Sequence, residues 1–289
     1  MGPVKRFERI FLATDGSEQS QAAVDATIAI AKSPTVRVRV GHVWNLEVHH
    51  RHGRWDVEVR SEAQKLVDAT VMRLLGAGVM AEPQIIRSDS DHVAAAIAIE
   101  AREFGADLVV IGSRGLSDWR SLTQHSISHQ LLCAVDCPVL IARARRKEAS
   151  RTVAKVVMAI AGGDDVEPAA RAAAAAGLPD ASVTVVHVRQ ALFGAQGFAY
   201  VESNDEMRQT MARACQMLID SGVTVQGMVA HQGPVAEAVA QIAKDLNADL
   251  IVIGSSRMGD IGSLLLGSVS HDLLHMTDRP VLVAERVPA

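Results

Sequence analysis

Apolar residues along the chain fall into two recurring patterns. Short, wholly apolar runs, "LVVI" at 108–111 and "LIVI" at 250–253, are typical of strands buried on both faces of a parallel sheet. Each run ends a longer segment, 93–113 or 235–255, whose earlier part has apolar residues at helical spacing. Strands that alternate with helices predict an α/β fold: a parallel sheet with right-handed crossovers and helices on both faces.

The whole pattern occurs twice, which indicates two copies of one domain. The matched segments are 9–31 with 155–177, 36–44 with 181–189, 57–76 with 204–221, 82–87 with 224–230, 93–113 with 235–255, and 137–143 with 279–285. Each half therefore predicts a βαβαβαβαβ unit and a doubly wound, five-stranded parallel sheet of strand order 3-2-1-4-5. A charged segment with neither pattern, 143–153, separates the copies, so we expect one domain at 1–146 and a second, divergent domain at 152–289.

Composition and charge narrow the class of protein. Apolar residues make up 48% of the chain and aromatic residues only 3%, a mixture that suits Ala-rich helices packed on Val/Ile strands. The net charge of −4, with both signs mixed, argues against nucleic acid as a partner. No stretch reaches the ~20 apolar residues of a membrane span, and the N-terminus does not resemble a signal peptide, so we expect a cytoplasmic protein without a membrane partner. The odd set Cys133, Cys137 and Cys215 predicts structural thiols rather than disulfides or a zinc site.

The predicted topology also indicates where a ligand binds. In open sheets of this kind, ligands lie beyond the carboxyl ends of the strands, where the strand order reverses. Three loops should meet there: 14–17 after the first strand, 43–45 after the second and 112–126 after the fourth.

Four segments carry a resemblance to a known family. They are "FLATDGS" (11–17), "HVW" (42–44), "VVIGSRG" (109–115) and "LLLGSVSHDLLHMTDRPVLV" (264–283). On these residues the chain resembles a tandem universal stress protein, with two UspA-type domains of the adenine nucleotide alpha hydrolase-like fold. The resemblance implies a stress-response regulatory protein that binds ATP or another adenine nucleotide, and it leaves open whether Mg²⁺ accompanies the nucleotide.

The nucleotide-binding branch of that family has the motif G-x2-G-x9-G-[ST] after the fourth strand, and neither half has it complete. Glycine lets the backbone approach a ribose or phosphate closely, and a Gly-Ser pair at a helix N-terminus offers N–H donors and a hydroxyl to an anion. The first half has Gly112, Gly115 and Ser126, with His125 in place of the third glycine. The second half has Gly254, Gly267 and Ser268, with Arg257 in place of the second glycine.

The loop after the first strand favours the first half as the binding site. The resemblance assigns Asp15 to contacts with the adenosine part of the nucleotide, whereas the matching residue of the second half is Ala161. Val43 falls where the family reads the adenine edge with backbone groups, and Trp44 either stacks nearby or packs on the sheet. The predicted nucleotide-binding residues are Ala13, Thr14, Asp15, Val43, Gly112, Gly115, His125 and Ser126, with Gly254, Arg257, Gly267 and Ser268 as a weaker set.

The sequence gives only weak support for catalysis or metal binding. Asp15 and Ser17 of the loop 14–17 and His125 of the loop 112–126 do not establish a triad without geometry, so no catalytic residue is assigned and enzyme activity stays open. His271 and His275 have the i, i+4 spacing of zinc ligands but no evident third ligand, and "HHRH" (49–52) is predicted to be a solvated loop rather than a metal site. Two alternatives to nucleotide binding therefore remain: a nucleotide-free interaction scaffold and a small-molecule enzyme that uses the same cleft.

The last strand of each half predicts how the domains assemble. "PVLIA" (138–142) and "PVLVA" (280–284) are apolar and end 3-2-1-4-5 sheets, where unpaired backbone groups invite pairing. Members of the family commonly dimerise through this strand. We therefore expect an intramolecular pseudo-dimer of the two domains, with a homodimer as a further step.

Overall fold

The computed structural model describes residues 6–49, 53–56, 60–89, 92–113, 127–143, 152–161, 165–177, 181–189, 191–194, 197–200, 202–230, 234–254 and 268–284. The chain divides into two compact units, Phe7–Arg151 and a unit that runs from Thr152 onward. None of the described helices is both long and apolar enough to cross a membrane. The three cysteines all fall within the described ranges, and none of them forms a disulfide there.

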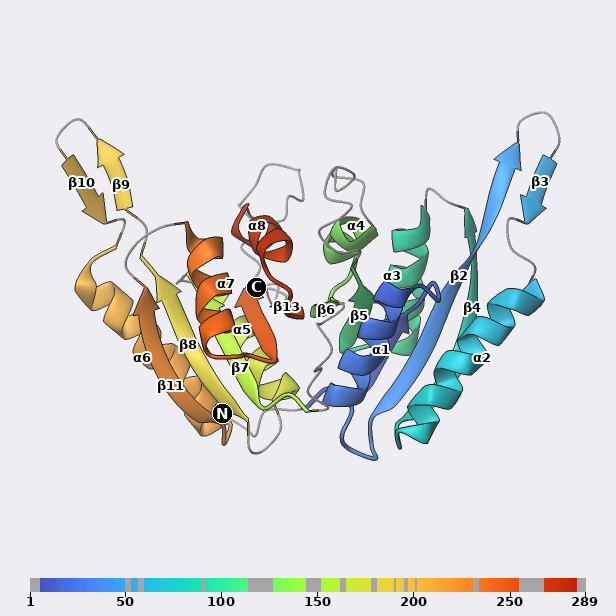
Figure 1. The fold of residues 1–289 in the computed structure, drawn as a ribbon, viewed down its shortest axis with the longest axis horizontal. Coiled ribbons are helices and arrows are strands. Elements are labelled where there is room, and N and C mark those ends of the chain that lie inside the picture. The colour runs from blue at the N-terminus through green and yellow to red at the C-terminus, as the bar shows by residue number, and fades with distance from the viewer. Residues whose placement is uncertain are drawn as a thin grey trace. The chain divides into compact units, whose positions relative to one another are not determined.

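The first unit is built on a parallel sheet whose strand order is β4-β2-β1-β5-β6 (Figure 1). The strands are β1 (Arg9–Ala13), β2 (Arg37–His49), β4 (Met80–Asp89), β5 (Leu108–Gly112) and β6 (Val139–Ala142). In order along the chain these strands are 1, 2, 3, 4 and 5, so the sheet has the order 3-2-1-4-5. The fold class predicted from the pattern of strands and helices is confirmed.

Four helices cover this sheet on its two faces. They are α1 (Glu18–Ile30), α2 (Arg60–Gly76), α3 (Val93–Phe104) and α4 (Ile127–Ala134). The chain moves across the sheet in one direction through α1 and α2 and in the other through α3, so right-handed crossovers put α3 on the opposite face. The helix contacts agree, because α1 contacts α2 and α3 contacts α4.

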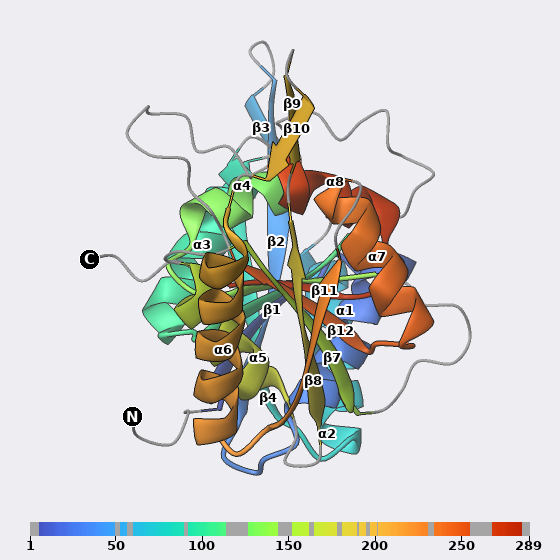
Figure 2. The ribbon, with the colours of Figure 1, turned by 90° about the vertical axis from the view of Figure 1, so that its left-hand side faces the viewer.

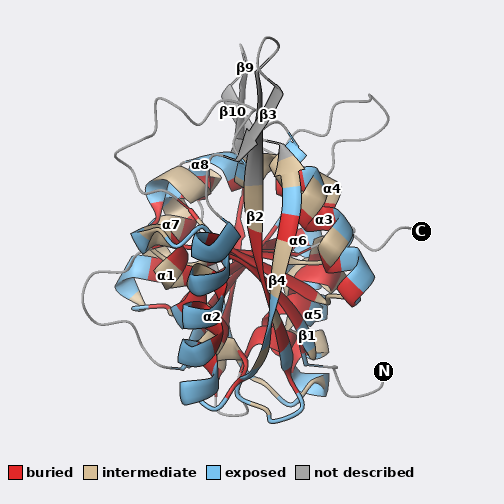
Figure 3. Ribbon diagram, turned by 90° about the vertical axis from the view of Figure 1, so that its right-hand side faces the viewer, coloured by how far each residue is buried: buried red, intermediate tan, exposed pale blue. Residues whose placement is uncertain are grey.

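The central strands are buried on both faces. In β1 the side chains of Ile10, Phe11 and Leu12 are all 0% exposed, and β5 is buried equally completely at Leu108–Val110. Burial of consecutive residues is the physical reason for the uninterrupted apolar runs, because a strand with helices on both sides has no face for polar residues (Figure 3).

The second unit repeats the architecture with the strand order β11-β8-β7-β12-β13. Its strands are β7 (Lys155–Ile160), β8 (Ser182–Val188), β11 (Thr224–Ala230), β12 (Leu250–Gly254) and β13 (Val281–Ala284). Its helices are α5 (Val166–Ala176), α6 (Asn204–Asp220), α7 (Val235–Asp245) and α8 (Ser268–Met276). The alanines of α5 from Ala172 to Ala176 are all buried, and α6 packs on β8 and β11 (Figure 2). This unit too has the order 3-2-1-4-5.

Each unit also has a short hairpin after its second strand that the sequence did not predict. In the first unit β2 continues to His49 and pairs antiparallel with β3 (Gly53–Asp56). In the second unit β9 (Ala191–Gly194) pairs antiparallel with β10 (Gly197–Tyr200). The expectation of a loop at 49–52 is therefore wrong at His49, while 50–52 lie outside the described residues. Polar composition predicts contact with solvent, but a hairpin satisfies its backbone groups whatever the side chains are.

An aspartate just before the fourth strand of each unit holds the start of the first strand. In the first unit the Asp107 carboxylate accepts hydrogen bonds from the backbone N–H of Glu8 (2.8 Å) and Arg9 (3.0 Å). In the second unit Oδ2 of Asp249 accepts from the N–H of Ala154 (3.0 Å) and Lys155 (2.9 Å). The repeated "ADL" of the sequence therefore has the same structural role in both halves.

We expect Asp107→Ala and Asp249→Ala each to lower the free energy of unfolding by about 1–2 kcal/mol, because each change removes a charged acceptor from two backbone donors. Asp136 is the matched control, since its carboxylate is 72% exposed and pairs at the surface with Arg102. Asp136→Ala should stay within about 0.5 kcal/mol of the unaltered chain in urea unfolding. Equal effects of all three changes would contradict this role.

Candidate functional site

The loop after β1 turns directly into the N-terminus of α1. Ser17 is the N-cap of that helix, and its hydroxyl oxygen accepts a hydrogen bond from the N–H of Ser20 at 3.2 Å. Gly16 has φ +76°, and a Cβ on it would lie 2.5 Å from Cδ1 of Leu66 in α2. The Leu66 side chain can move aside, but the positive φ is strained for a residue with a Cβ, so the turn that places Asp15 at the helix N-terminus favours glycine at position 16.

Asp15 is exposed and held by two hydrogen bonds from the same residue. Its Oδ1 accepts from the N–H of Ser17 at 3.0 Å and from the Ser17 hydroxyl at 2.6 Å. Partial burial acts to raise the pKa of the Asp15 carboxyl, but the hydrogen bonds from Ser17 outweigh it, so the pKa lies below its ordinary value of 3.8. The carboxylate is therefore ionised at neutral pH and acts as a hydrogen-bond acceptor only.

Thr14 and His42 lie behind this loop and are both buried, with exposed fractions of 6% and 7%. The Thr14 hydroxyl donates to Oγ of Ser20 at 3.1 Å and accepts from the N–H of Gly16 at 3.2 Å. His42 Nδ1 lies 2.8 Å from the main-chain oxygen of Thr14. The residues predicted at the end of the first strand, Ala13 to Asp15, thus share one hydrogen-bonded loop, whereas the contact from His42 was not predicted.

Gly112, the first motif glycine, ends β5 against the first turn of α1. A Cβ on Gly112 would lie 2.4 Å from the main-chain oxygen of Gln19 and 2.9 Å from Cα of Ser20. Real atoms do not approach so closely, and backbone cannot rotate away as a side chain can. Gly112 is therefore required for packing between β5 and α1, independently of any ligand.

Gly254 has the corresponding role in the second unit. A Cβ there would lie 2.7 Å from Cβ of Asp165, the residue just before α5. The position that corresponds to Asp15 is Ala161, so the strand end and helix approach each other as in the first unit but without the carboxylate.

Val43 and Trp44 lie within β2, whose pairing with β4 continues to Leu46, so the loop expected at 43–45 is wrong and these residues are part of the strand. Val43 is half-buried and pairs with Ile86, and Trp44 pairs with Arg87. The Arg87 guanidinium lies over the Trp44 ring, 5.5 Å from its centroid. Trp44 therefore packs against the neighbouring strand, one of the two roles considered for it.

The remaining predicted residues are described only in part. Ser268 is the first residue of α8. Gly115, His125, Ser126, Arg257 and Gly267 lie outside the described residues, as does most of both motif loops. The structure therefore brings together Ala13, Thr14 and Asp15 with Gly112 through α1, and the phosphate-loop part of the prediction stays a prediction.

The histidine pair of α8 forms a contact between rings. The centroids of His271 and His275 are 4.5 Å apart, with the rings at 63° to each other. Within the part of the chain that the structure describes, no group of three or more His, Cys, Asp or Glu side chains is arranged to hold a metal ion.

Comparison with known proteins assigns the family. Residues 6–143 and 152–285 each match the Universal stress protein family. The chain belongs to the universal stress protein family. The two matches occupy the two halves in turn, so the chain is a tandem universal stress protein.

Individual relatives agree with this assignment. Universal stress protein Rv2005c of Mycobacterium tuberculosis is 25% identical over 99% of this chain and 100% of its own length. Universal stress protein YxiE of Bacillus subtilis is 29% identical over 47% of this chain and 99% of its own. The crystal structure of a universal stress protein from Archaeoglobus fulgidus has 19% sequence identity and a TM-score of 0.72, and it covers 97% of this chain and 98% of its own.

We expect Gly112→Ala to lower the free energy of unfolding by about 1–3 kcal/mol, because the new methyl group meets the backbone of α1. Gly76 is the matched control, since a Cβ there meets nothing within 4 Å. Gly76→Ala should stabilise the helix by up to about 1 kcal/mol. Chemical unfolding of both variants checks the prediction, and a neutral Gly112→Ala would contradict it.

The lowered pKa of Asp15 predicts a pH-dependent contribution to stability. A carboxyl whose pKa is lower in the folded chain stabilises it fully above the unfolded pKa, near 3.9, and loses that contribution as the pH falls through the folded value. The difference in melting temperature between the unaltered chain and Asp15→Asn should therefore be largest near neutral pH and vanish in acid. In a Ser17→Ala background this pH-dependent difference should shrink, because one donor is gone. A difference that is constant with pH would contradict the prediction.

Proposed function

We propose that the first domain binds an adenine nucleotide at the loop between β1 and α1, and that this binding is the basis of a regulatory role in the stress response. The observation that carries the proposal is the ionised Asp15 carboxylate, oriented by Ser17 at the N-terminus of α1. Both bonds from Ser17 end on Oδ1, so Oδ2 can accept hydrogen bonds from a ligand.

The chemistry of Asp15 suits the adenosine part of a nucleotide rather than its phosphates. A carboxylate accepts hydrogen bonds from the ribose hydroxyls or the exocyclic amine of adenine, but it repels phosphate. The phosphates would then lie toward the loop that follows Gly112, where Gly115, His125 and Ser126 complete the predicted set. Whether the nucleotide is ATP, and whether Mg²⁺ accompanies it, belongs to this proposal.

Two other members of the family support adenine nucleotide as the ligand class. One universal stress protein has been solved in complex with cAMP and one from Archaeoglobus fulgidus in complex with dAMP. We extend that ligand class to this chain only at the first domain, because the second has Ala161 where the first has Asp15.

A nucleotide-free scaffold is the second candidate function, and one observation favours it. Gly112 and Gly254 are both required for packing of a helix N-terminus on a strand end. Their presence therefore does not by itself call for a ligand.

Whichever of the two functions holds, we propose that the last strands, Val139–Ala142 and Val281–Ala284, pair to form an intramolecular pseudo-dimer, from which a homodimer can form.

Asp15→Ala should lower the affinity for ATP about tenfold or more, because losing a charge-assisted hydrogen bond costs about 1.5–3 kcal/mol and each 1.4 kcal/mol is a factor of ten. Asp25 is the control on the same helix, since its carboxylate is exposed and pairs with Arg73. Calorimetry should give about one nucleotide per chain and an unchanged affinity for Asp25→Ala. Equal affinity in Asp15→Ala would overturn the site, and no binding to the unaltered chain would favour the scaffold.

A further inference from the structure

We propose that His42 is a positioning residue for Asp15, which holds the nucleotide-binding loop in its binding conformation before the ligand arrives. His42 is on β2, whereas Asp15 follows β1, so the two are joined only by the tertiary structure. The expected effect of His42 on nucleotide binding rests on the proposed function. The contact between His42 and the loop does not depend on any ligand.

The contact between His42 and Thr14 determines which ring nitrogen of His42 carries hydrogen. The main-chain oxygen of Thr14 can only accept a hydrogen bond, and His42 Nδ1 lies 2.8 Å from it. Nδ1 therefore carries hydrogen and donates. His42 and Thr14 are both buried, so water cannot readily replace this bond. Removing the His42 donor therefore leaves the main-chain oxygen of Thr14 without this hydrogen bond.

The acceptor of this bond belongs to the peptide group that leads into Asp15. The carbonyl of Thr14 and the N–H of Asp15 lie in one planar unit, so a bond that orients the oxygen also orients the start of Asp15. On the other side of Thr14, its N–H donates to the main-chain oxygen of Gly41 at 2.9 Å. Bonds to β2 thus hold Thr14 on both sides, and the Asp15 carboxylate projects from a fixed point.

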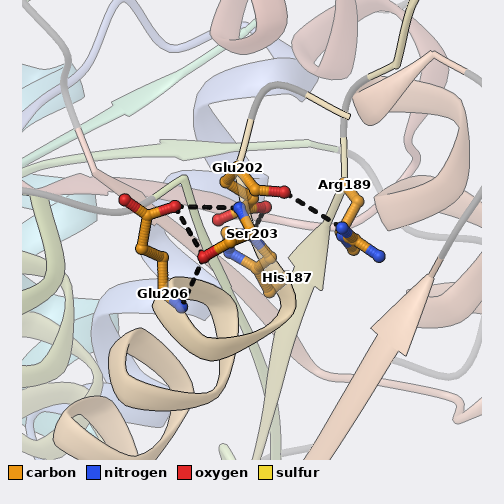
Figure 4. Close-up of polar contacts among 5 residues, drawn as sticks. All are labelled: His187, Arg189, Glu202, Ser203 and Glu206. Atoms are coloured by element: carbon orange, nitrogen blue, oxygen red, sulfur yellow. Dashed lines mark hydrogen bonds and ion pairs between the residues drawn. The ribbon is translucent and has the colours of Figure 1, made fainter. Parts of the chain in front are cut away.

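The second unit uses the equivalent histidine differently. His187 occupies the position of His42 at the end of β8 and is 1% exposed, but its Nε2 pairs with the Glu202 carboxylate (Figure 4). Among the described residues its Nδ1 has no hydrogen-bond partner. Nη2 of Arg189, the counterpart of Trp44, donates to the main-chain oxygen of Glu202 at 3.0 Å.

Glu202 leads into the N-terminus of α6 rather than into the first-strand loop. Ser203 and Glu206 form a capping box there, with the Ser203 N–H donating to Oε2 of Glu206 at 2.8 Å (Figure 4). Among the described residues, the contact from this histidine to the loop after the first strand is therefore found in the half that keeps Asp15, and the half with Ala161 has no such contact from His187 Nδ1. This observation supports a positioning role for His42.

Substitution by asparagine or glutamine tests the two ring nitrogens of His42 individually. The side-chain N–H of asparagine falls near the position of Nδ1, whereas that of glutamine falls near Nε2. His42→Gln should weaken ATP binding about tenfold, because a buried acceptor loses its donor, whereas His42→Asn should bind within about threefold of the unaltered chain. His187→Gln is the control in the second unit, since it keeps a donor for Glu202, and its affinity should be unchanged.

A second measurement tests the contact without nucleotide. Nitrogen-15 spectra of the imidazole ring at about pH 8 should show hydrogen on Nδ1 of His42. Amide hydrogen exchange of residues 15–17 should be faster in His42→Gln than in His42→Asn. These two readouts decide whether His42 holds the loop even if the unaltered chain binds no nucleotide, in which case the proposed function alone fails.

The overturning results are equally specific. Hydrogen on Nε2 alone, unchanged amide exchange in His42→Gln, or ATP affinity in His42→Gln equal to that of the unaltered chain would each refute the positioning role. Equal losses of affinity in His42→Gln and His42→Asn would refute it as well, because a general packing defect does not distinguish the two nitrogens.

Discussion

The close approach of a helix N-terminus to the end of a neighbouring strand is the constraint on which the rest of each unit depends. In the first unit the backbone of α1 at Gln19 and Ser20 occupies the space that a side chain on Gly112 would need. In the second unit Asp165 occupies the space beside Gly254. Because a single methyl group would separate these elements, both halves keep glycine here although they have diverged elsewhere.

This approach decides what the first-strand loop can do. With α1 held against β5, the chain has Thr14, Asp15 and Gly16 between the end of β1 and the N-cap Ser17, and the positive φ of Gly16 completes the turn. A short, hydrogen-bonded loop loses little conformational entropy when a ligand binds, because its groups are already oriented. The first domain therefore holds the Asp15 carboxylate in place at this turn, and the second has Ala161 at the corresponding position.

The described contacts of the equivalent buried histidine in the two domains involve different ring nitrogens. His42 contacts the backbone beside the candidate site, and His187 contacts a carboxylate at the start of α6. Each arrangement gives a buried polar ring a partner, as burial requires, and among the described residues the His42 ring contacts the loop that carries Asp15. A duplicated fold can thus keep its core while the partners of a few polar side chains change.

The sequence by itself determined the strand order, the repeat and the family, because burial on both faces of a parallel strand leaves a wholly apolar run at 108–111 and again at 250–253. The resemblance to the family also predicted Asp15 as a binding residue, since the motif that carries it, 11–17, is a continuous segment of the sequence. The hairpins at β2–β3 and β9–β10, the packing role of Gly112 and the bond from His42 to Thr14 were decided only by the tertiary structure. Each of these features depends on atoms from separate parts of the chain that come into contact only when the chain folds. A local pattern of residues does not show which of those atoms will meet.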